Sequence, residues 1–183
     1  MCGIVGIASK NDCINDIISG LYSLEYRGYD SSGLAIIKNN QFEYSKDIGK
    51  ISNLEKNVKK NKLSGNIVIA HTRWATHGKP SIKNSHPFVK NNCALVHNGI
   101  VENYSDLMKY YSINKKNLKS DTDSEVIAEV YDKLLNKFND PIEAIKSLNK
   151  KIIGSFSIAF LLHGSKSIYI TRRDSPLVLG IGK

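Results

Sequence analysis

The sequence has few cysteines and no long apolar run. Its three cysteines, Cys2, Cys13 and Cys93, are an odd number and include no Cys-x-x-Cys pair, so we expect neither a disulfide framework nor a structural zinc site. No apolar run approaches the roughly 20 residues of a membrane-spanning helix. No basic stretch leads into an apolar segment, as it would in a signal peptide. We therefore expect a protein of a reducing compartment, the cytoplasm, that does not span a membrane.

Arginine is also scarce, although the net charge is +9. A charge of this size raises the alternative of a basic, non-catalytic module that binds nucleic acid. The lysines are scattered along the chain, however, and this argues against a nucleic-acid partner. A guanidinium binds a carboxylate through two parallel hydrogen bonds, which an ammonium cannot do. Arg27 and Arg73 are therefore candidates for a geometric role, with structural salt bridges as the alternative.

The length of 183 residues suggests one domain, and the chain has no repeats and no low-complexity linker. Hydrophobic periodicity predicts strands at residues 2–9, 33–38, 41–46, 66–72, 93–97, 155–162, 167–172 and 177–181. It predicts helices at residues 13–26, 51–62, 103–111, 122–137 and 141–150, with residues 76–92 as a loop. Strands and helices thus come in blocks. This order favours an α+β fold in which two largely antiparallel sheets lie face to face with helices outside.

Cys2 points most directly to chemistry. Removal of Met1 would leave a cysteine that carries both a thiol and a free α-amino group. The thiolate is the reactive form of cysteine, and an α-amine with a pKa of about 8 can take the thiol proton directly or through a water. Cys2 is therefore a candidate nucleophile with its own base. The alternative is a small residue in an N-terminal strand.

Four further segments are rich in polar residues, at positions 25–31, 71–78, 97–100 and 120–125. Asn98 and Gly99 fit a turn, or an oxyanion site in which the Asn98 amide and the Gly99 N–H bind a developing negative charge. Asp123 is expected at the start of a helix, where the helix dipole favours a carboxylate, but it could also bind an ammonium group. Thr122 and Glu125 fit a capping box for the same helix.

The histidines of the second segment do not indicate a metal site. His71 and His77 are six residues apart, which does not match two ligands on one helix face, and no cysteine or acidic cluster completes a site. Trp74 is the only tryptophan of the chain and follows a predicted strand into a loop, which suits a pocket wall.

Together with Cys2, these segments make the chain resemble the class II glutamine amidotransferase domains, which use an N-terminal cysteine nucleophile. The resemblance runs from Cys2 to about Gly182. Within this class, the chain most specifically resembles the hexosamine-forming synthases. Residues 26–31 (Tyr-Arg-Gly-Tyr-Asp-Ser) and 71–78 (His-Thr-Arg-Trp-Ala-Thr-His-Gly) match motifs specific to them. It implies the four-layer αββα sandwich of the N-terminal-nucleophile hydrolases, with no cofactor.

The resemblance also implies a role for each matching residue. Cys2 would attack the side-chain amide of glutamine and form a γ-glutamyl thioester, with Asn98 and the N–H of Gly99 as the oxyanion hole. Arg73 would bind the α-carboxylate of glutamine, and Asp123 its α-ammonium group. The remaining implied roles are pocket contacts for Trp74, Thr76, His77 and His86, and ordering of the cysteine by Arg27 and Tyr29.

For the longer enzymes, the resemblance implies a homo-oligomer that converts fructose 6-phosphate to glucosamine 6-phosphate with ammonia taken from glutamine. The sugar-isomerase domains that bind fructose 6-phosphate have no counterpart here. We therefore expect residues 1–183 to form a glutaminase domain that is incomplete at its C-terminus. The alternatives are the glutaminase domain of another class II amidotransferase, an N-terminal-nucleophile hydrolase that acts on a different amide, or an inactive relative.

Overall fold

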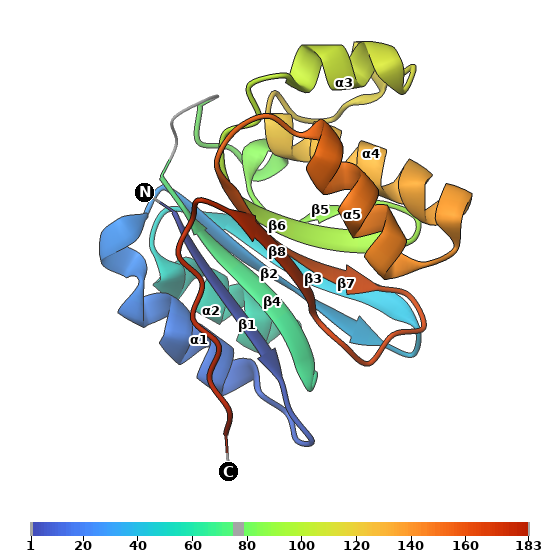
Figure 1. Ribbon diagram of the computed structural model, residues 1–183. Coiled ribbons are helices and arrows are strands. Elements are labelled where there is room, and N and C mark those ends of the chain that lie inside the picture. Colours follow the sequence, from blue (N-terminus) through green and yellow to red (C-terminus); the bar gives the residue numbers. More distant parts are fainter. Residues whose placement is uncertain (1, 75–78, 183) are drawn as a thin grey trace.

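The computed structural model describes residues 2–74 and 79–182, and in these residues it contains two four-stranded sheets, each antiparallel throughout. The first sheet has, in spatial order, strands β1 (Gly3–Ala8), β4 (Ile67–Arg73), β2 (Ser31–Lys38) and β3 (Gln41–Ile48). The second sheet has, in spatial order, strands β5 (Phe88–Val89), β6 (Cys93–Gly99), β7 (Phe156–Leu162) and β8 (Tyr169–Arg173) (Figure 1).

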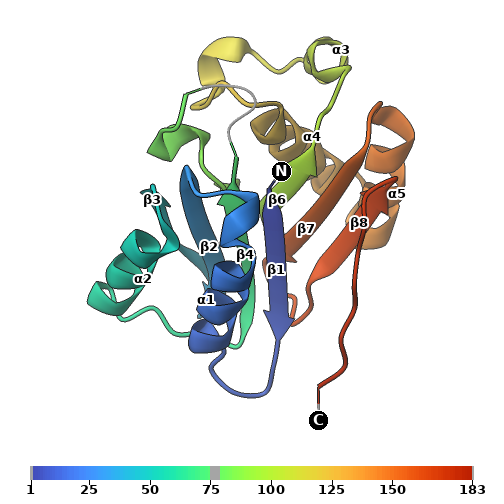
Figure 2. The same ribbon diagram turned by 90° about the vertical axis from the view of Figure 1, so that its left-hand side faces the viewer.

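The helices lie outside the two sheets. Helices α1 (Ile14–Ser23) and α2 (Ile51–Lys60) cover the first sheet, and α4 (Asp123–Phe138) and α5 (Pro141–Lys151) cover the second. Helix α3 (Tyr104–Tyr110) packs beside α4, and short 3-10 turns occupy Glu25–Arg27, Ile82–Asn84 and Lys115–Asn117. Figure 2 shows the order of the layers as helix, sheet, sheet, helix. The predicted α+β fold with two face-to-face antiparallel sheets is therefore confirmed.

Strand alternation separates the apolar residues into layers. On β4, Val68 and Ala70 pack toward α1 and α2, whereas Ile67 and Ile69 pack between the sheets. The same alternation on β6 places alanine and valine side chains at positions 94 and 96 between the sheets. His71 continues the odd-numbered face of β4, so its side chain belongs to the layer between the sheets.

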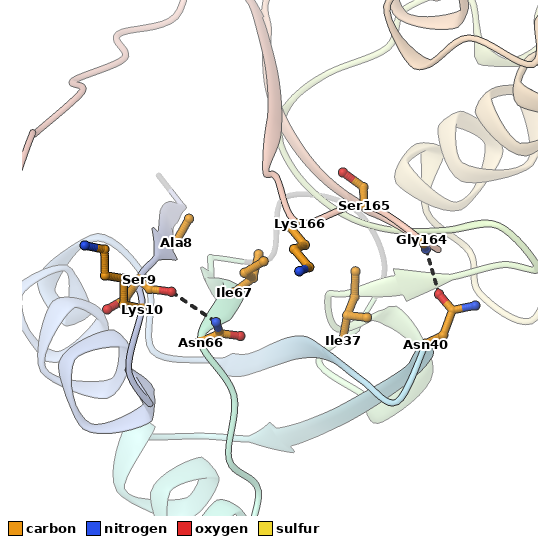
Figure 3. Close-up of a pocket in the computed structure, with 10 residues that line it drawn as sticks. All are labelled: Ala8, Ser9, Lys10, Ile37, Asn40, Asn66, Ile67, Gly164, Ser165 and Lys166. Atoms are coloured by element: carbon orange, nitrogen blue, oxygen red, sulfur yellow. Dashed lines mark hydrogen bonds between the residues drawn. The ribbon is translucent and has the colours of Figure 1, made fainter.

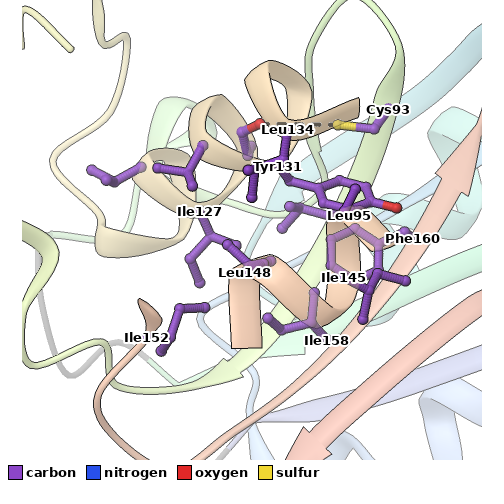
Figure 4. Close-up of a cluster of buried hydrophobic side chains, with 14 of the residues drawn as sticks. Cys93, Leu95, Ile127, Tyr131, Leu134, Ile145, Leu148, Ile152, Ile158 and Phe160 are labelled. Carbon is purple, nitrogen blue, oxygen red and sulfur yellow. Dashed lines mark hydrogen bonds between the residues drawn. The ribbon is translucent and has the colours of Figure 1, made fainter. Parts of the chain in front are cut away.

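The largest apolar cluster lies between the second sheet and helices α4 and α5 (Figure 4). Tyr131 of α4 is fully buried there, with its ring centroid 4.2 Å from that of Phe160 on β7. Its hydroxyl donates to the carbonyl of Pro141 at 3.4 Å, which satisfies the one polar atom of a buried ring. This cluster fixes α4 on the sheet, and α4 begins at Asp123.

The predicted strand at 177–181 is wrong. These residues form no strand, and Val178 is 91% exposed. A strand is stabilised by ladder hydrogen bonds, and no strand of the described chain pairs with this segment. The predicted loop at 76–92 also needs correction, because its described part contains the 3-10 turn Ile82–Asn84 and the two-residue strand β5.

The predicted capping box of α4 is also wrong. Thr122 is the N-cap residue, but its side chain makes no capping hydrogen bond. The buried carboxylate of Glu125 instead accepts from the N–H of Ser120 at 2.6 Å and from the Lys90 ammonium at 2.8 Å. A backbone donor and a cation satisfy this carboxylate more fully than one N-cap N–H would. Glu125 therefore orders the loop that precedes Asp123.

Candidate active site

The candidate site lies where several strands begin or end on one side of the sandwich. Gly3 pairs with Thr72 in the β1–β4 ladder, and Ser31 pairs with Arg73 in the β2–β4 ladder. The start of β1, the start of β2 and the end of β4 therefore coincide. In the second sheet, β6 ends at Gly99 opposite the start of β7. Figure 2 shows β1 beside β6, with the start of β1 close to the end of β6.

Most of the residues predicted to act on a substrate line one pocket at this edge. The pocket is lined by Cys2, Arg73, Trp74, His86, His97, Gly99, Thr122, Asp123 and Ser124. Six of the predicted residues are in that set. Thr76 and His77 lie outside the described residues, and their predicted contacts stay predictions.

The sulfur of Cys2 is held against the backbone of Trp74. The N–H of Trp74 donates to Sγ at 3.3 Å, and Sγ lies 3.7 Å from the carbonyl oxygen of the same residue. Burial raises the pKa of the Cys2 thiol, while the Trp74 N–H and the charge of Arg73 act in the opposite direction. A thiol with a raised pKa is protonated at neutral pH, so it needs a base to act as a nucleophile.

Residues 27–29 pack against Cys2 and against the end of β4. The Nε of Arg27 donates to the carbonyl of Cys2 at 3.3 Å. The ring of Tyr29 meets that of Trp74 edge-on, with centroids 5.4 Å apart. Between them, a Cβ on Gly28 would lie 2.6 Å from the carbonyl carbon of Arg73, so only glycine allows this approach. Arg27 thus contacts the backbone of Cys2, and Tyr29 contacts Trp74, whose backbone meets the Cys2 sulfur. Their role in ordering the cysteine stays a prediction.

Asn98 and Gly99 form the end of a strand, and the predicted turn at this pair is wrong. The N–H of Ile100 donates to the carbonyl of Ser155 at 3.2 Å. By the alternation of an antiparallel ladder, the neighbouring Gly99 is then a non-hydrogen-bonded position, so β7 does not use its N–H. Gly99 has φ +133°, and a Cβ there would lie 2.2 Å from the Ser155 carbonyl, so the position requires glycine.

The pocket presents opposite charges. Arg73, at the end of β4, is buried, and Asp123 is the first residue of α4. One carboxylate oxygen of Asp123 accepts from the N–H of Val101 at 2.8 Å, which fixes the direction of this carboxylate. A guanidinium and a carboxylate in one pocket match the two charges of a free α-amino acid.

A cluster of three buried histidines lies at the pocket, and it was not predicted. His86 and His97 line the pocket, and His71 packs against His86 behind them. The ring of His71 stacks on that of His86 with centroids 4.0 Å apart, and Nδ1 of His97 lies 2.9 Å from the hydroxyl of Ser124. Burial lowers the pKa of all three histidines, that of His71 to about 3, so each is neutral at pH 7. His71 stands in one of the polar segments, and its alternation with Ile67 and Ile69 was the available signal of burial.

The loop that carries His86 is anchored by β2 and β3. The ammonium of Lys46 donates to the carbonyl of Ser85 at 2.7 Å, and burial lowers the pKa of Lys46 to about 8. Gly33 lies so close to this loop that a Cβ there would stand 2.2 Å from the His86 carbonyl. Both contacts hold His86 against the pocket. The sequence alone did not indicate them.

The other two cysteines have different surroundings. Cys13 and Cys93 are buried in the two helix-covered clusters, where burial raises the pKa of Cys13 to about 11 and that of Cys93 well above its ordinary value. Both remain thiols at neutral pH. Of the three cysteines, Cys2 alone lines the pocket.

A second, larger hollow of about 660 Å³ lies at the other end of the sandwich (Figure 3). It is lined by Ala8, Ser9, Lys10, Ile37, Asn40, Asn66, Ile67, Gly164, Ser165 and Lys166. It contains no cysteine, histidine or carboxylate, and its two lysines are exposed. Among the described residues, no group of three or more His, Cys, Asp or Glu side chains could hold a metal ion. None of the described helices has the length and apolar character needed to cross a bilayer.

The comparison with known families agrees with this site. A family model described as a glutamine amidotransferase domain matches residues 71–180, and the chain belongs to this family. Its solved structural neighbours include the glutamine phosphoribosylpyrophosphate amidotransferase from B. subtilis, with a TM-score of 0.78 at 21% identity over 94% of this chain and 37% of that one. Another is a glutamine aminotransferase class-II domain protein from Silicibacter pomeroyi, with a TM-score of 0.60 at 16% identity over 97% of this chain and 79% of that one. At these identities the likeness shows the fold alone.

Curated relatives of higher identity carry a narrower name. The chain is 39% identical to the glutamine–fructose-6-phosphate aminotransferase (isomerizing) of Bradyrhizobium diazoefficiens and 44% identical to that of Francisella tularensis, in both cases over 100% of this chain and 30% of the relative. It is 43% identical to the enzyme of the same name from Helicobacter pylori, over 100% of this chain and 31% of the relative. The chain thus spans under one third of the length of these relatives.

Proposed function

We propose that this domain hydrolyses L-glutamine to glutamate and ammonia through Cys2. The observation that carries the proposal is the shared pocket of Cys2, Arg73, Gly99 and Asp123. Such a pocket holds a nucleophile, a backbone donor at a position that requires glycine, and a charge for each end of a free amino acid. The membership in the glutamine amidotransferase family supports glutamine as that amino acid.

In the proposed reaction, the α-amine of Cys2, exposed by removal of Met1, takes the thiol proton. The sulfur attacks the δ-carbonyl carbon of glutamine, and the carbonyl oxygen becomes an oxyanion that the Asn98 amide and the Gly99 N–H stabilise. As the C–N bond breaks, the amine returns its proton to the leaving nitrogen and ammonia departs. A water then attacks the thioester, gives a proton to the amine, and releases glutamate and the thiol.

The raised pKa of the Cys2 thiol explains why this chemistry needs the α-amine. Neither of the other buried thiols has an amine of its own, and the nearby histidines have lowered pKa values because of burial. The Trp74 N–H that donates to Sγ would stabilise the thiolate once the proton has left. We assign substrate contacts to Trp74 and His86, which line the pocket, and to Thr76 and His77 by the sequence resemblance alone.

For a longer protein that contains this domain, we propose the reaction named for its relatives. Ammonia would be transferred to fructose 6-phosphate to give glucosamine 6-phosphate, in a cytoplasmic homo-oligomer. The identity of 39–44% over the whole of this chain supports that assignment over other class II amidotransferases. The solved glutamine phosphoribosylpyrophosphate amidotransferase from B. subtilis shares 21% identity.

The test is glutamate release from L-glutamine by the purified chain, with the intact mass recorded on the same sample. Release by protein that lacks Met1, and none by Cys2→Ala, would support the proposal. No release by protein with an exposed Cys2 would favour the alternative of an inactive relative. Release of ammonia from L-asparagine at an equal rate would instead favour an amidase of different specificity. The pocket would then not discriminate between the side chains of asparagine and glutamine.

A further inference from the structure

The Asn98 amide is held by a buried histidine of the other sheet. Nε2 of His71 lies 2.8 Å from Oδ1 of Asn98 and 3.1 Å from the carbonyl oxygen of His97. The two side chains meet because each continues the inward-facing residues of its strand. His71 follows Ile67 and Ile69 on β4, and Asn98 follows the even-numbered face of β6 into the same layer.

The second contact fixes the proton on His71. A backbone carbonyl is an acceptor and never a donor, so the nitrogen that faces the His97 carbonyl must carry a proton. Nε2–H is then shared between two acceptors, while the buried Nδ1 has no hydrogen-bond partner among residues 2–74 and 79–182, as expected for the bare nitrogen of a neutral ring. Burial lowers the pKa of His71 to about 3, which keeps the ring in this neutral form at pH 7.

The tautomer in turn fixes the Asn98 amide. The two ends of an asparagine amide are nearly alike in shape, and only hydrogen-bond partners select between the two orientations. Since Nε2 is a donor, the atom of Asn98 that faces it must be the oxygen. The –NH₂ group then points away from His71, and its two protons are available on the other side of the amide.

We propose that His71 is a positioning residue for the oxyanion site. Its Nε2–H holds the Asn98 oxygen and thereby turns the Asn98 –NH₂ toward the substrate carbonyl. The inference rests on the proposed glutamine hydrolysis. It adds a residue that touches neither substrate nor nucleophile. Without this donor, the amide can rotate so that its oxygen faces the developing negative charge, which repels it.

The first test needs no activity. In ¹⁵N-labelled protein, the ring nitrogens of His71 are assigned by comparison with His71→Gln. We expect Nε2 protonated and Nδ1 bare from about pH 5 to 9, in line with a pKa far below the ordinary ~6.5 of histidine. A proton on Nδ1 would overturn the proposal, because Nε2 could then not donate to Asn98.

The second test also needs no activity and concerns the Asn98 side-chain amide. His71→Met removes the donor at similar volume, whereas His71→Gln places an amide –NH₂ near the position of Nε2. We expect the Asn98 –NH₂ resonances to show greater mobility in His71→Met and wild-type order in His71→Gln. Equal order in both variants would show that His71 does not hold the amide.

The third test is a double-mutant cycle on glutamate release. His71→Met should lower kcat by roughly 10-fold to 100-fold, toward the 10²–10³-fold typical of losing one oxyanion donor, with KM for glutamine changed by less than about 2-fold. His71→Gln should recover most of kcat. In an Asn98→Ala background, His71→Met should have almost no further effect, since its action passes through the missing amide.

Two controls separate the possible failures. His163→Gln alters a histidine that stacks on Phe42 near the other end of the sandwich and should leave kcat unchanged. Alkylation of Cys2 by iodoacetamide should proceed equally in His71→Met, because the nucleophile is intact. If wild type is active and His71→Met is equally active, the positioning role alone is overturned. The same holds if His71→Met lowers kcat as strongly in the Asn98→Ala background as in wild type. An inactive wild type would reject the proposed hydrolysis, while the two resonance measurements would still decide the role of His71.

Discussion

The layer between the two sheets is open at both ends, and the two ends differ in chemistry. At one end, β1 and β2 start and β4 and β6 finish, and the open edge carries Cys2, Arg73 and Gly99. At the other end, the hollow of about 660 Å³ is lined by Lys10 and Lys166 with serine and asparagine side chains. The larger opening therefore lacks the thiol and the guanidinium of the candidate site, and cavity size alone would not have selected that site.

The difference arises from what each end buries. At the Cys2 end, polar side chains are partly or fully buried and bonded to backbone groups. The sulfur of the half-buried Cys2 accepts from the Trp74 N–H, and the buried His71 donates to the His97 carbonyl. At the other end, Lys10 and Lys166 are exposed. An enclosed polar group has a fixed direction and a shifted pKa, which catalysis requires, whereas an exposed lysine remains a solvated charge.

The largest expected effect comes from the sulfur itself. Cys2→Ala should reduce glutamate release by roughly 10⁴-fold or more, because no other group can form the thioester. Cys13→Ala and Cys93→Ala should retain activity, since both thiols lie in the apolar clusters. The measurement is the initial rate of glutamate formation by wild type and the three variants, each checked for folding and intact mass. Activity lost in Cys93→Ala but kept in Cys2→Ala would reverse the assignment of the nucleophile.

The next effect concerns the buried guanidinium. Arg73→Lys keeps the charge but loses the planar fork that grips a carboxylate. Loss of one charge-assisted hydrogen bond, worth about 1.5–3 kcal/mol, should raise KM for glutamine by roughly 10-fold to 100-fold. The effect on kcat should be much smaller. Steady-state kinetics over a wide glutamine range decide this, and an unchanged KM would remove Arg73 from the carboxylate role.

A third prediction concerns the buried histidines and pH. The folded protein keeps His71 neutral down to a pKa of about 3, whereas an unfolded histidine binds a proton below about pH 6.5. Stability is therefore complete above pH 6.5 and falls as pH is lowered, by about 1.4 kcal/mol per pH unit for each such histidine. Urea unfolding at pH 7, 6 and 5 should show a smaller decline in His71→Gln than in wild type. If the free energy of unfolding declines equally with pH in both proteins, His71 is protonated in the folded protein over this pH range.

The smallest effects are expected at the larger hollow. Lys10→Ala and Lys166→Ala remove exposed side chains and should change the free energy of unfolding by less than about 0.5 kcal/mol. The kcat/KM for glutamine should stay the same, because these residues lie at the other end of the layer. A large loss of glutaminase activity in either variant would contradict the contrast between the two ends.

Apolar spacing predicted most elements, because a helix or strand that buries one face shows its period in the sequence. The helix expected at 122–137 is Asp123–Phe138, and the strand expected at 66–72 is Ile67–Arg73. The strand expected at 177–181 failed, since apolar residues can form a ladder only where a partner strand exists. The predicted capping box at Thr122 is wrong because the Glu125 carboxylate accepts instead from the Ser120 N–H and from the Lys90 ammonium.

The residues of the candidate site were likewise predicted only in part. Cys2, Arg73, Asn98 and Asp123 were predicted from their chemistry and from the family motifs, and all but Asn98 line one pocket. Asn98 is not one of the lining residues, and its side-chain oxygen lies 2.8 Å from Nε2 of His71. The role of His71 had no local signal, because its partner comes from a strand of the other sheet.

The sequence by itself determined most of the elements, the faces that they bury, and a thiol next to the N-terminus. Only the tertiary structure decided which ends meet. The Cys2 sulfur and the Trp74 backbone are 72 residues apart in the chain, and His71 and Asn98 are 27 apart. The physical reason is that periodicity reports burial of a face, whereas contact between two faces follows from how both sheets pack across one apolar layer.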